Sequence, residues 1–300
     1  MEKFIQLLAA GIALGSIYAL VALGFAVVFK ATGTINFAHG GFVVLGAFLV
    51  FNYSVTWGLP FYLSILIAVV SMALIGVVVE RTVLRRMVGQ PVFSTIMVTI
   101  GLLFILQQFV QTIWPDPTVQ IDHPWRNQTV EIGGVIIAHR DIWTVVFAGA
   151  LMVAFFVFFR YSKTGVAMRA TAFDQEAALA QGINVSFVFA VSWAIAGVVA
   201  VLAGVMLGAG GTELDATIGF VAFRAFPAII LGGLDSPAGA VVGGLIIGVS
   251  EVMTQGYIAT SSSFEWLGEN FHLVMPYIVM LIFMMFRPYG LFGTREVERV

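Results

Sequence analysis

The sequence predicts an all-α, polytopic membrane protein with about eight to nine transmembrane helices, some of them short or discontinuous. Of its 300 residues, 60% are hydrophobic and only 10% are charged, whereas a soluble domain carries about 25% charged residues. Apolar runs long enough for a helix to cross the hydrocarbon layer, which takes about 20 residues, recur along the whole chain. We therefore expect residues 1–300 to form a single membrane domain.

Nine apolar runs are candidate spans. The second and the seventh are short, and we expect that either could be broken or re-entrant. In chain order the candidates are Phe4–Phe29, Phe37–Tyr53, Phe61–Val79, Phe93–Ile113, Ile142–Phe159, Phe187–Ala209, Ile218–Leu234, Ala238–Tyr257 and Leu273–Phe286.

Basic residues predict the orientation of these spans, because Lys and Arg favour the cytoplasmic side. They follow the third, fifth and ninth spans, so the odd-numbered spans end in the cytoplasm. The N-terminus and the loop over residues 114–141 are then outside, and the loop over residues 161–185 and the C-terminus are inside. Losing or gaining one short span would reverse only the N-terminus. These basic residues are Arg81, Arg85, Arg86, Arg160, Lys163, Arg169, Arg287, Arg295 and Arg299.

Several kinds of chemistry have no support in the sequence. The chain has no cysteine, which excludes disulfides, thiol catalysis and cysteine-bound metals. Its four histidines are scattered, so we expect no catalytic residues, no metal site and no cofactor. No Gly-rich nucleotide-binding loop ending in Lys-Ser or Lys-Thr occurs. Any ATP hydrolysis that energises this chain must therefore take place in another chain.

Many of the 32 glycines are spaced four residues apart. Such pairs allow helix backbones to approach closely in lipid. We expect ordinary packing within one bundle, and a dedicated dimer face is the alternative. The pairs are Gly11/Gly15, Gly204/Gly208, Gly239/Gly243 and Gly244/Gly248.

The segment Tyr161–Val185 predicts a short helix on the cytoplasmic face. From Val166 to Gln181 it is rich in alanine and other good helix formers, and Gly182 stands where a C-terminal cap belongs. A helix lying on the membrane would carry large apolar residues on one face and basic residues on the other. Here the apolar positions are mostly alanine, which favours docking into a groove of a partner protein.

The stretch "TINFAHGG", Thr34–Gly41, places polar groups and flexible backbone beside the first span. Asn36 can cap a helix that begins at about Phe37, and Gly40 and Gly41 permit a close approach or a break. The N-terminus of a discontinuous helix can hold an anionic substrate group in a transporter. A plain cytoplasmic turn with a capping Asn and a hydrogen-bonded His39 is the alternative.

Polar residues interrupt other spans. A cation within a span is costly, so we expect Arg224 to have a structural role with Glu213 or Asp215 as its partner. An intramembrane acid is a functional candidate, so Glu251 either lines a substrate path or pairs with a donor on a neighbouring helix. Interhelical hydrogen bonding is the ordinary explanation of Gln107, Gln108 and Gln111.

Four stretches together resemble the LivH-type permease subunit of branched-chain amino acid ABC importers. The resemblance covers essentially the whole chain, and the four stretches occur in the order and spacing of that family. They are "INFAHG", "TGVAMRATAFDQEAALAQGI", "IGFVAFRAFPAIILGGLDSPAGAVVGGLIIGVSE" and "PYGLFGTREVERV".

The resemblance implies a non-catalytic, multi-pass permease subunit of the bacterial inner (plasma) membrane that moves branched-chain or related small amino acids. Its implied partners are a second, LivM-like permease subunit, two cytoplasmic ATPase subunits, an external solute-binding protein and membrane lipid, with no nucleic acid. In that family the inner helix couples to the ATPase, and the matching positions here are Gly165, Arg169, Ala170, Asp174, Ala177 and Gly182. We place Asn36, His39, Gly40, Gly41 and Glu251 on the substrate path.

The sequence departs from the family pattern at Gly41, where an acid is common, at Ala216 and Thr217, where Pro is common, and at Arg224, where Lys is common. These departures leave urea, an amide or an aromatic acid open as the substrate. A stand-alone secondary transporter is the rival class. Against it, Glu251 is the only clear acid in the middle of a span.

Overall fold

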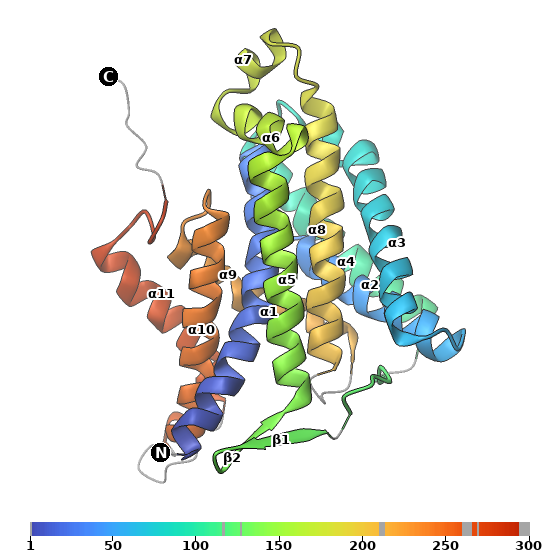
Figure 1. The fold of residues 1–300 in the computed structure, drawn as a ribbon. Coiled ribbons are helices and arrows are strands. Elements are labelled where there is room, and N and C mark those ends of the chain that lie inside the picture. The colour runs from blue at the N-terminus through green and yellow to red at the C-terminus, as the bar shows by residue number, and fades with distance from the viewer. Residues whose placement is uncertain are drawn as a thin grey trace.

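The structure is a computed structural model that describes residues 2–115, 118–126, 128–209, 214–259, 266–268 and 270–293. Within these ranges, seven helices are long and apolar enough to cross a membrane, which confirms the predicted class of fold (Figure 1). They are α1 (Glu2–Thr32), α2 (His39–Phe51, continued by a π-helical turn over Asn52–Thr56), α3 (Phe61–Thr82), α4 (Val92–Ile113), α5 (His139–Tyr161), α8 (Val185–Gly208) and α10 (Pro237–Tyr257).

Two further apolar helices are shorter. A 3-10 turn over Ala216–Phe220 leads into α9 (Val221–Gly232), and another over Phe271–Leu273 leads into α11 (Met275–Phe286). The second and seventh candidate spans, α2 and α9, thus carry an irregular turn at one end, and the described residues show no break within either helix. The nine helices correspond one to one with the nine candidate spans.

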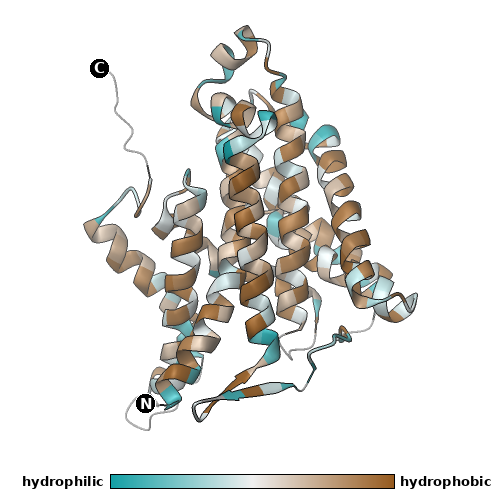
Figure 2. Cartoon of the chain, viewed as in Figure 1, coloured by the Kyte–Doolittle hydropathy of each residue, from teal (hydrophilic) through white to brown (hydrophobic). Residues whose placement is uncertain are grey.

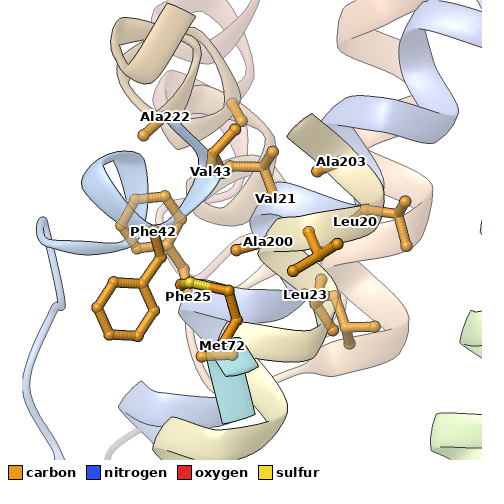
Figure 3. Close-up of a cluster of buried hydrophobic side chains, with 14 of the residues drawn as sticks. Leu20, Val21, Leu23, Phe25, Phe42, Val43, Met72, Ala200, Ala203 and Ala222 are labelled. Atoms are coloured by element: carbon orange, nitrogen blue, oxygen red, sulfur yellow. The ribbon is translucent and has the colours of Figure 1, made fainter. Parts of the chain in front are cut away.

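Helix α1 is the centre of the bundle (Figure 1). It packs against α5, α8, α9 and α10, and every residue from Tyr18 to Val28 is buried. Figure 3 shows how side chains of α1, such as Phe25, meet Phe42 of α2, Met72 of α3 and Ala200 of α8 in a common core. Alternating large and small side chains let these helices interlock at close distance.

The glycine pairs pack within the chain, as expected. A Cβ on Gly11 would lie 2.9 Å from the Cα of Val249, and one on Gly15 would lie 2.8 Å from the Cα of Leu245. The backbones of α1 and α10 therefore touch, and a larger residue at either glycine would force them apart. Gly204 of α8 is in similarly tight contact with α2.

Polar residues of the spans make interhelical bonds. The Nε2 of Gln107 donates to the carbonyl of Ala216 at 3.3 Å, which confirms the ordinary explanation for that glutamine. Glu80, buried at the end of α3, accepts two hydrogen bonds from Arg85, at 3.1 and 2.8 Å. Arg85 also donates to the carbonyl of Ser186 at 3.0 Å, so this pair joins the end of α3 to the start of α8.

The outward faces of α3, α4, α5 and α11 carry large exposed apolar side chains. In Figure 2 the hydrophobic colour runs along the middle of the helices, and the hydrophilic colour gathers near their ends and on the hairpin. This distribution is the one that a bilayer requires.

One end of the bundle carries a β-hairpin within the predicted outer loop, which the sequence analysis did not predict. β1 (Thr129–Ile132) pairs antiparallel with β2 (Val135–Ala138). The two turn residues, Gly133 and Gly134, have φ values of 60° and 82°, which non-glycine residues rarely adopt and which two-residue hairpin turns require. We call this the hairpin end. Arg295 and Arg299 lie outside the described residues.

The opposite end carries α6 (Lys163–Phe173) and α7 (Gln175–Ala180), and we call it the α6 end. The last turn of α1 reaches the same end, where the Nζ of Lys30 donates to the carbonyl of Asp235 at 3.0 Å. The basic residues that follow α3 and α5 lie at this end, so the orientation predicted from them makes the α6 end cytoplasmic.

Candidate functional site

The alanine-rich segment forms two short helices, so the prediction of one helix over Val166–Gln181 is wrong. The break between α6 and α7 is at Asp174, whose backbone is extended (φ −158°, ψ 113°). Its Oδ1 accepts a hydrogen bond from the N–H of Ala177 at 2.9 Å. An Asp that caps a helix in this way satisfies an N–H that has no partner within the helix, and here the cap starts α7. Gly182 ends the segment with φ 80°, in agreement with its predicted role as a cap.

Helix α6 is fastened to the end of α5. The hydroxyl of Ser162 accepts a hydrogen bond from the N–H of Gly165 at 2.8 Å. The guanidinium of Arg169 donates to the carbonyls of Phe159 and Arg160 and lies over the ring of Phe159, 5.4 Å from its centroid. The last carbonyls of a helix lack partners within the helix and favour a nearby cation. Arg169 therefore ties the two helices together inside this chain.

The face of α6 and α7 that points away from the bundle includes two residues that sequence reasoning missed. Phe173 is 94% exposed and Leu179 is 58% exposed. Large apolar side chains with no cover within the chain are typical of a surface that binds another protein. Their presence among alanines in a segment expected to dock could have indicated them. Of the predicted coupling residues, Gly165 is buried, Arg169 and Ala170 are partly buried, and Asp174, Ala177 and Gly182 are exposed.

The chain between α1 and α2 is irregular, and Asn36 organises it. Its Oδ1 accepts a hydrogen bond from the N–H of Ala38 at 3.1 Å, and the N–H of Phe37 donates to the hydroxyl of Thr99 on α4 at 3.2 Å. The prediction that Asn36 caps the helix is wrong: α2 begins at His39, two residues later than expected, and its N-cap residue is Ala38, with no side-chain cap hydrogen bond. Asn36 instead stabilises the turn that precedes the helix.

His39 is completely buried at the start of α2. Its ring fits against the backbone of Gly24, where any side chain would collide with it, and it lies 5.3 Å from the ring of Phe25. Neither ring nitrogen has a hydrogen-bond partner, and neither does the Nδ2 of Asn36. Buried polar groups are nearly always paired, so the described protein atoms alone do not satisfy this region.

Gly40 and Gly41 bring the two irregular spans together. A Cβ on Gly40 would lie 2.5 Å from the carbonyl oxygen of Gly219, in the 3-10 turn before α9, and Gly41 is similarly tight against Leu106 of α4. The first turn of α2 therefore touches the turn that leads into α9. Discontinuous helices that meet in this way are a feature of substrate sites in transporters.

A cluster of aromatic rings fills the space beside this meeting point. Phe37 stacks on Phe223 with centroids 5.8 Å apart and lies 5.5 Å from Phe226. Phe25 contacts Phe226 from α1, and Phe220 continues the cluster outward with 40% exposure. Sequence reasoning missed these residues, because single phenylalanines in apolar spans are most often ordinary core residues.

Glu251 lies in a cavity of about 630 Å³ between α1, α5, α8, α9 and α10, and this cavity is also lined by Thr217 and Ile218 of the turn that meets α2. Its Oε2 accepts a hydrogen bond from the hydroxyl of Tyr18 at 2.8 Å, so it has a donor on a neighbouring helix and also lines a cavity. Arg224 lines the same cavity. The four path residues on and before α2 are not among the described residues that line it, so the predicted path residues form two separate groups.

Of the two predicted partners of Arg224, Asp215 is bonded elsewhere. The carboxylate of Asp215 accepts hydrogen bonds from the N–H and the hydroxyl of Thr217, both at 2.6 Å, because it caps the 3-10 turn there. Among the described residues no ion pair joins it to Arg224, and Glu213 lies outside the described residues.

Comparison with known families decides the class of the protein. The family described as "Branched-chain amino acid transport system / permease component" matches residues 7–284. The chain belongs to this permease family. It is 31% identical to the high-affinity branched-chain amino acid transport system permease protein LivH of Escherichia coli (strain K12), over 99% of this chain and 98% of that protein. The permease is also 29% identical to the protein BraD of Pseudomonas aeruginosa, which has the same description, with the same coverage.

A solved chain in the structure titled "PsaBC from Streptococcus pneumoniae in complex with Fab" aligns with a TM-score of 0.44 and 15% identity, over 94% of this chain and 90% of that one. Membership of the permease family and the apolar helices make this chain a multi-pass protein of the inner (plasma) membrane.

Proposed function

We propose that this permease is the transmembrane subunit of an ABC importer that moves branched-chain or related small amino acids into the cell. The match to the permease family over residues 7–284 carries this proposal. It is also supported by two relatives that align with this chain over 98% of their length and are described as branched-chain amino acid transport permeases. In this proposal the chain catalyses no reaction, and its partner subunits hydrolyse ATP.

The proposed partners are a second permease, two cytoplasmic ATPases and an external solute-binding protein. Helices α6 and α7 would dock on one ATPase through the exposed side chains of Phe173, Ala177 and Leu179. Because Arg169 bonds the carbonyls at the end of α5, a displacement of α6 would be passed directly to a span that packs against the central helix α1.

The proposed substrate path runs past the point where α2 and the turn before α9 meet. Asn36, His39 and Gly40 lie there, with buried polar atoms that lack a partner in the described chain. The aromatic cluster beside it is only partly covered, with Phe220 40% exposed. A second permease packed against this side would complete the path.

The experiment is ATP-driven uptake into proteoliposomes that contain the complete importer, with its solute-binding protein supplied on the outside. We expect uptake of labelled leucine, isoleucine or valine that needs ATP and all of the partner subunits. Uptake of urea, an amide or an aromatic acid in place of these would redirect the substrate assignment. Uptake by this chain alone would overturn the importer.

A further inference from the structure

We propose that the cavity between Tyr18, Arg224 and Glu251 is a binding site for a zwitterionic amino acid with an aliphatic side chain. The inference rests on the proposed function and deepens it. In this site the carboxylate of Glu251 binds the ammonium group, the guanidinium of Arg224 binds the α-carboxylate, and the apolar wall contacts the side chain.

The position of the cavity suits an importer. Its lining comes from the first half of α1, the first turns of α5, the last turn of α8 and the second half of α10. All of these are the parts of the helices nearest the hairpin end, which the basic residues predict to be outside. A substrate released there by an external protein would meet this cavity before it reached the α2 break.

The charges of the cavity are complementary to a zwitterion. Arg224 is close enough to Glu251 to interact with it electrostatically, yet no ion pair joins them among the residues that the structure describes. Tyr18 bonds only Oε2 of Glu251, and Oε1 makes none of the described side-chain hydrogen bonds. The cavity is therefore lined both by a carboxylate with one oxygen outside the described side-chain hydrogen bonds and by a guanidinium.

The other acids of the cavity are already engaged. Asp141 lies 3.5 Å from Arg140, and Asp215 caps the turn at Thr217. Glu251 is therefore the acid available for an ammonium group.

Part of the remaining wall is apolar, and the rest is polar, with Thr144 and Thr217 among its residues. Leu14, Ile17 and Val221 line the apolar part together with small alanines of α1. Ligand sites of this kind combine an apolar lining with a few polar groups that fix orientation. The volume of about 630 Å³ leaves space for a small amino acid with some water.

The test uses the absence of cysteine from the native chain. Gln255 lies in the same cavity, one turn beyond Glu251 on the same helix face, and is exposed. We measure how fast a membrane-impermeant maleimide labels Gln255→Cys in the complete importer, in nanodiscs without nucleotide. The competing probes are leucine, leucinamide, which lacks the carboxylate, and 4-methylpentanoate, which lacks the ammonium group.

We expect leucine to slow labelling, and each analogue to need a concentration at least about tenfold higher for equal protection, because each loses one charge-assisted contact. In the same background, Glu251→Gln and Arg224→Gln should weaken protection by leucine by a similar factor. Tyr18→Phe should keep it, because the carboxylate remains. Trp57→Cys, exposed at the hairpin end, should be labelled at a rate that leucine does not change.

The proposed site would be overturned if all three compounds protected Gln255→Cys equally, or if leucine did not slow its labelling at all. If Tyr18→Phe lost as much protection as Glu251→Gln, the role of Glu251 would be structural: its hydrogen bond with Tyr18 would hold α10 against α1. That result would also overturn the binding site. None of these results depends on transport. Uptake of leucine by the wild-type importer, together with no protection by leucine in the Gln255→Cys variant, therefore refutes the site and leaves the proposed function intact.

Discussion

At the scale of single residues, Gly40 controls how closely the two irregular spans approach each other. Its missing side chain leaves room for the carbonyl of Gly219, to which a Cβ would come within 2.5 Å, and for the Cβ of Ala222, at 3.0 Å. The collision at Gly219 involves backbone, which cannot rotate away as a flexible side chain can. The substitution of this one glycine should therefore separate two elements that lie far apart in the sequence.

We expect Gly40→Ala to destabilise the permease by about 1–3 kcal/mol, the usual cost of overpacking a tight core, and to reduce transport more than it reduces abundance. The measurements are the thermal midpoint of the purified importer in detergent and its uptake rate. Gly101→Ala on α4 is the matched control, because a Cβ there meets nothing within 4 Å. A Gly40→Ala protein as stable and active as Gly101→Ala would show that the two spans need not touch.

The residues of the α2 break also show what sequence can reveal about a site. The pattern of Asn36, His39, Gly40 and Gly41 was sufficient to predict irregular backbone between α1 and α2, but the predicted Asn cap of α2 is absent, because the helix begins after Ala38. It could not place Gly219 against Gly40, because that contact joins positions nearly 180 residues apart and depends on how the whole bundle packs. Arg224 and Glu251 were recognised singly for the same reason, and only the fold places them in one cavity.

At the scale of elements, the break between α6 and α7 separates two possible roles for Asp174. Its carboxylate caps α7 through the N–H of Ala177, and it is also exposed, where an ATPase could contact its charge. Asn caps helices about as well as Asp does but carries no charge. The two substitutions Asp174→Asn and Asp174→Ala therefore distinguish the cap from the charge.

If the cap is what matters, Asp174→Ala should lose about 1 kcal/mol of local helix stability and most of the ATP-driven uptake, while Asp174→Asn should keep uptake near the wild-type rate. Uptake and substrate-stimulated ATPase activity of the reconstituted importer are the measurements. Equal loss in both variants would assign the role to the charge.

Arg169 gives a second prediction at this scale. Arg169→Ala removes the bonds to the carbonyls of Phe159 and Arg160, about 1 kcal/mol of local stability, and should uncouple α6 from α5. We expect transport-linked ATPase activity to fall while the amount of permease in the membrane stays the same. Lys163→Ala is the control, because it removes an exposed cation from the same helix. A fall in membrane abundance that matches the fall in activity would indicate a general folding role instead.

Elements were more predictable when they were long. The seven long spans follow from apolar length alone, since each must cover the hydrocarbon layer. The alanine-rich segment was predicted as one helix because its residues favour helix throughout. The break arises because the side chain of Asp174 accepts a hydrogen bond from a backbone N–H and so starts a new helix. The hairpin was missed although its sequence carries a hairpin signal, since Gly133 and Gly134 separate two runs that are rich in β-branched residues. Its strands are only four residues long.

At the scale of the whole molecule, orientation links every functional proposal. The hairpin end must face outward for the cavity of Glu251 to receive a substrate, and the α6 end must face the cytoplasm for α6 and α7 to reach an ATPase. Both requirements are met by the orientation that the basic residues predict, and both fail together if that orientation is reversed.

A pair of single-cysteine variants tests the orientation and the docking at once, in a chain that has no cysteine of its own. Ala177→Cys is exposed on α7, and Trp57→Cys is exposed at the hairpin end. In intact cells an impermeant maleimide should label Trp57→Cys and leave Ala177→Cys unlabelled until the membrane is opened. A bifunctional reagent should then join Ala177→Cys, and not Trp57→Cys, to a nucleotide-hydrolysing subunit. Labelling of Ala177→Cys from outside would reverse the orientation. Labelling as expected without any cross-link to an ATPase would remove the physical basis for coupling transport to ATP. In that case α6 and α7 would not contact a subunit whose movement they could transmit to the spans.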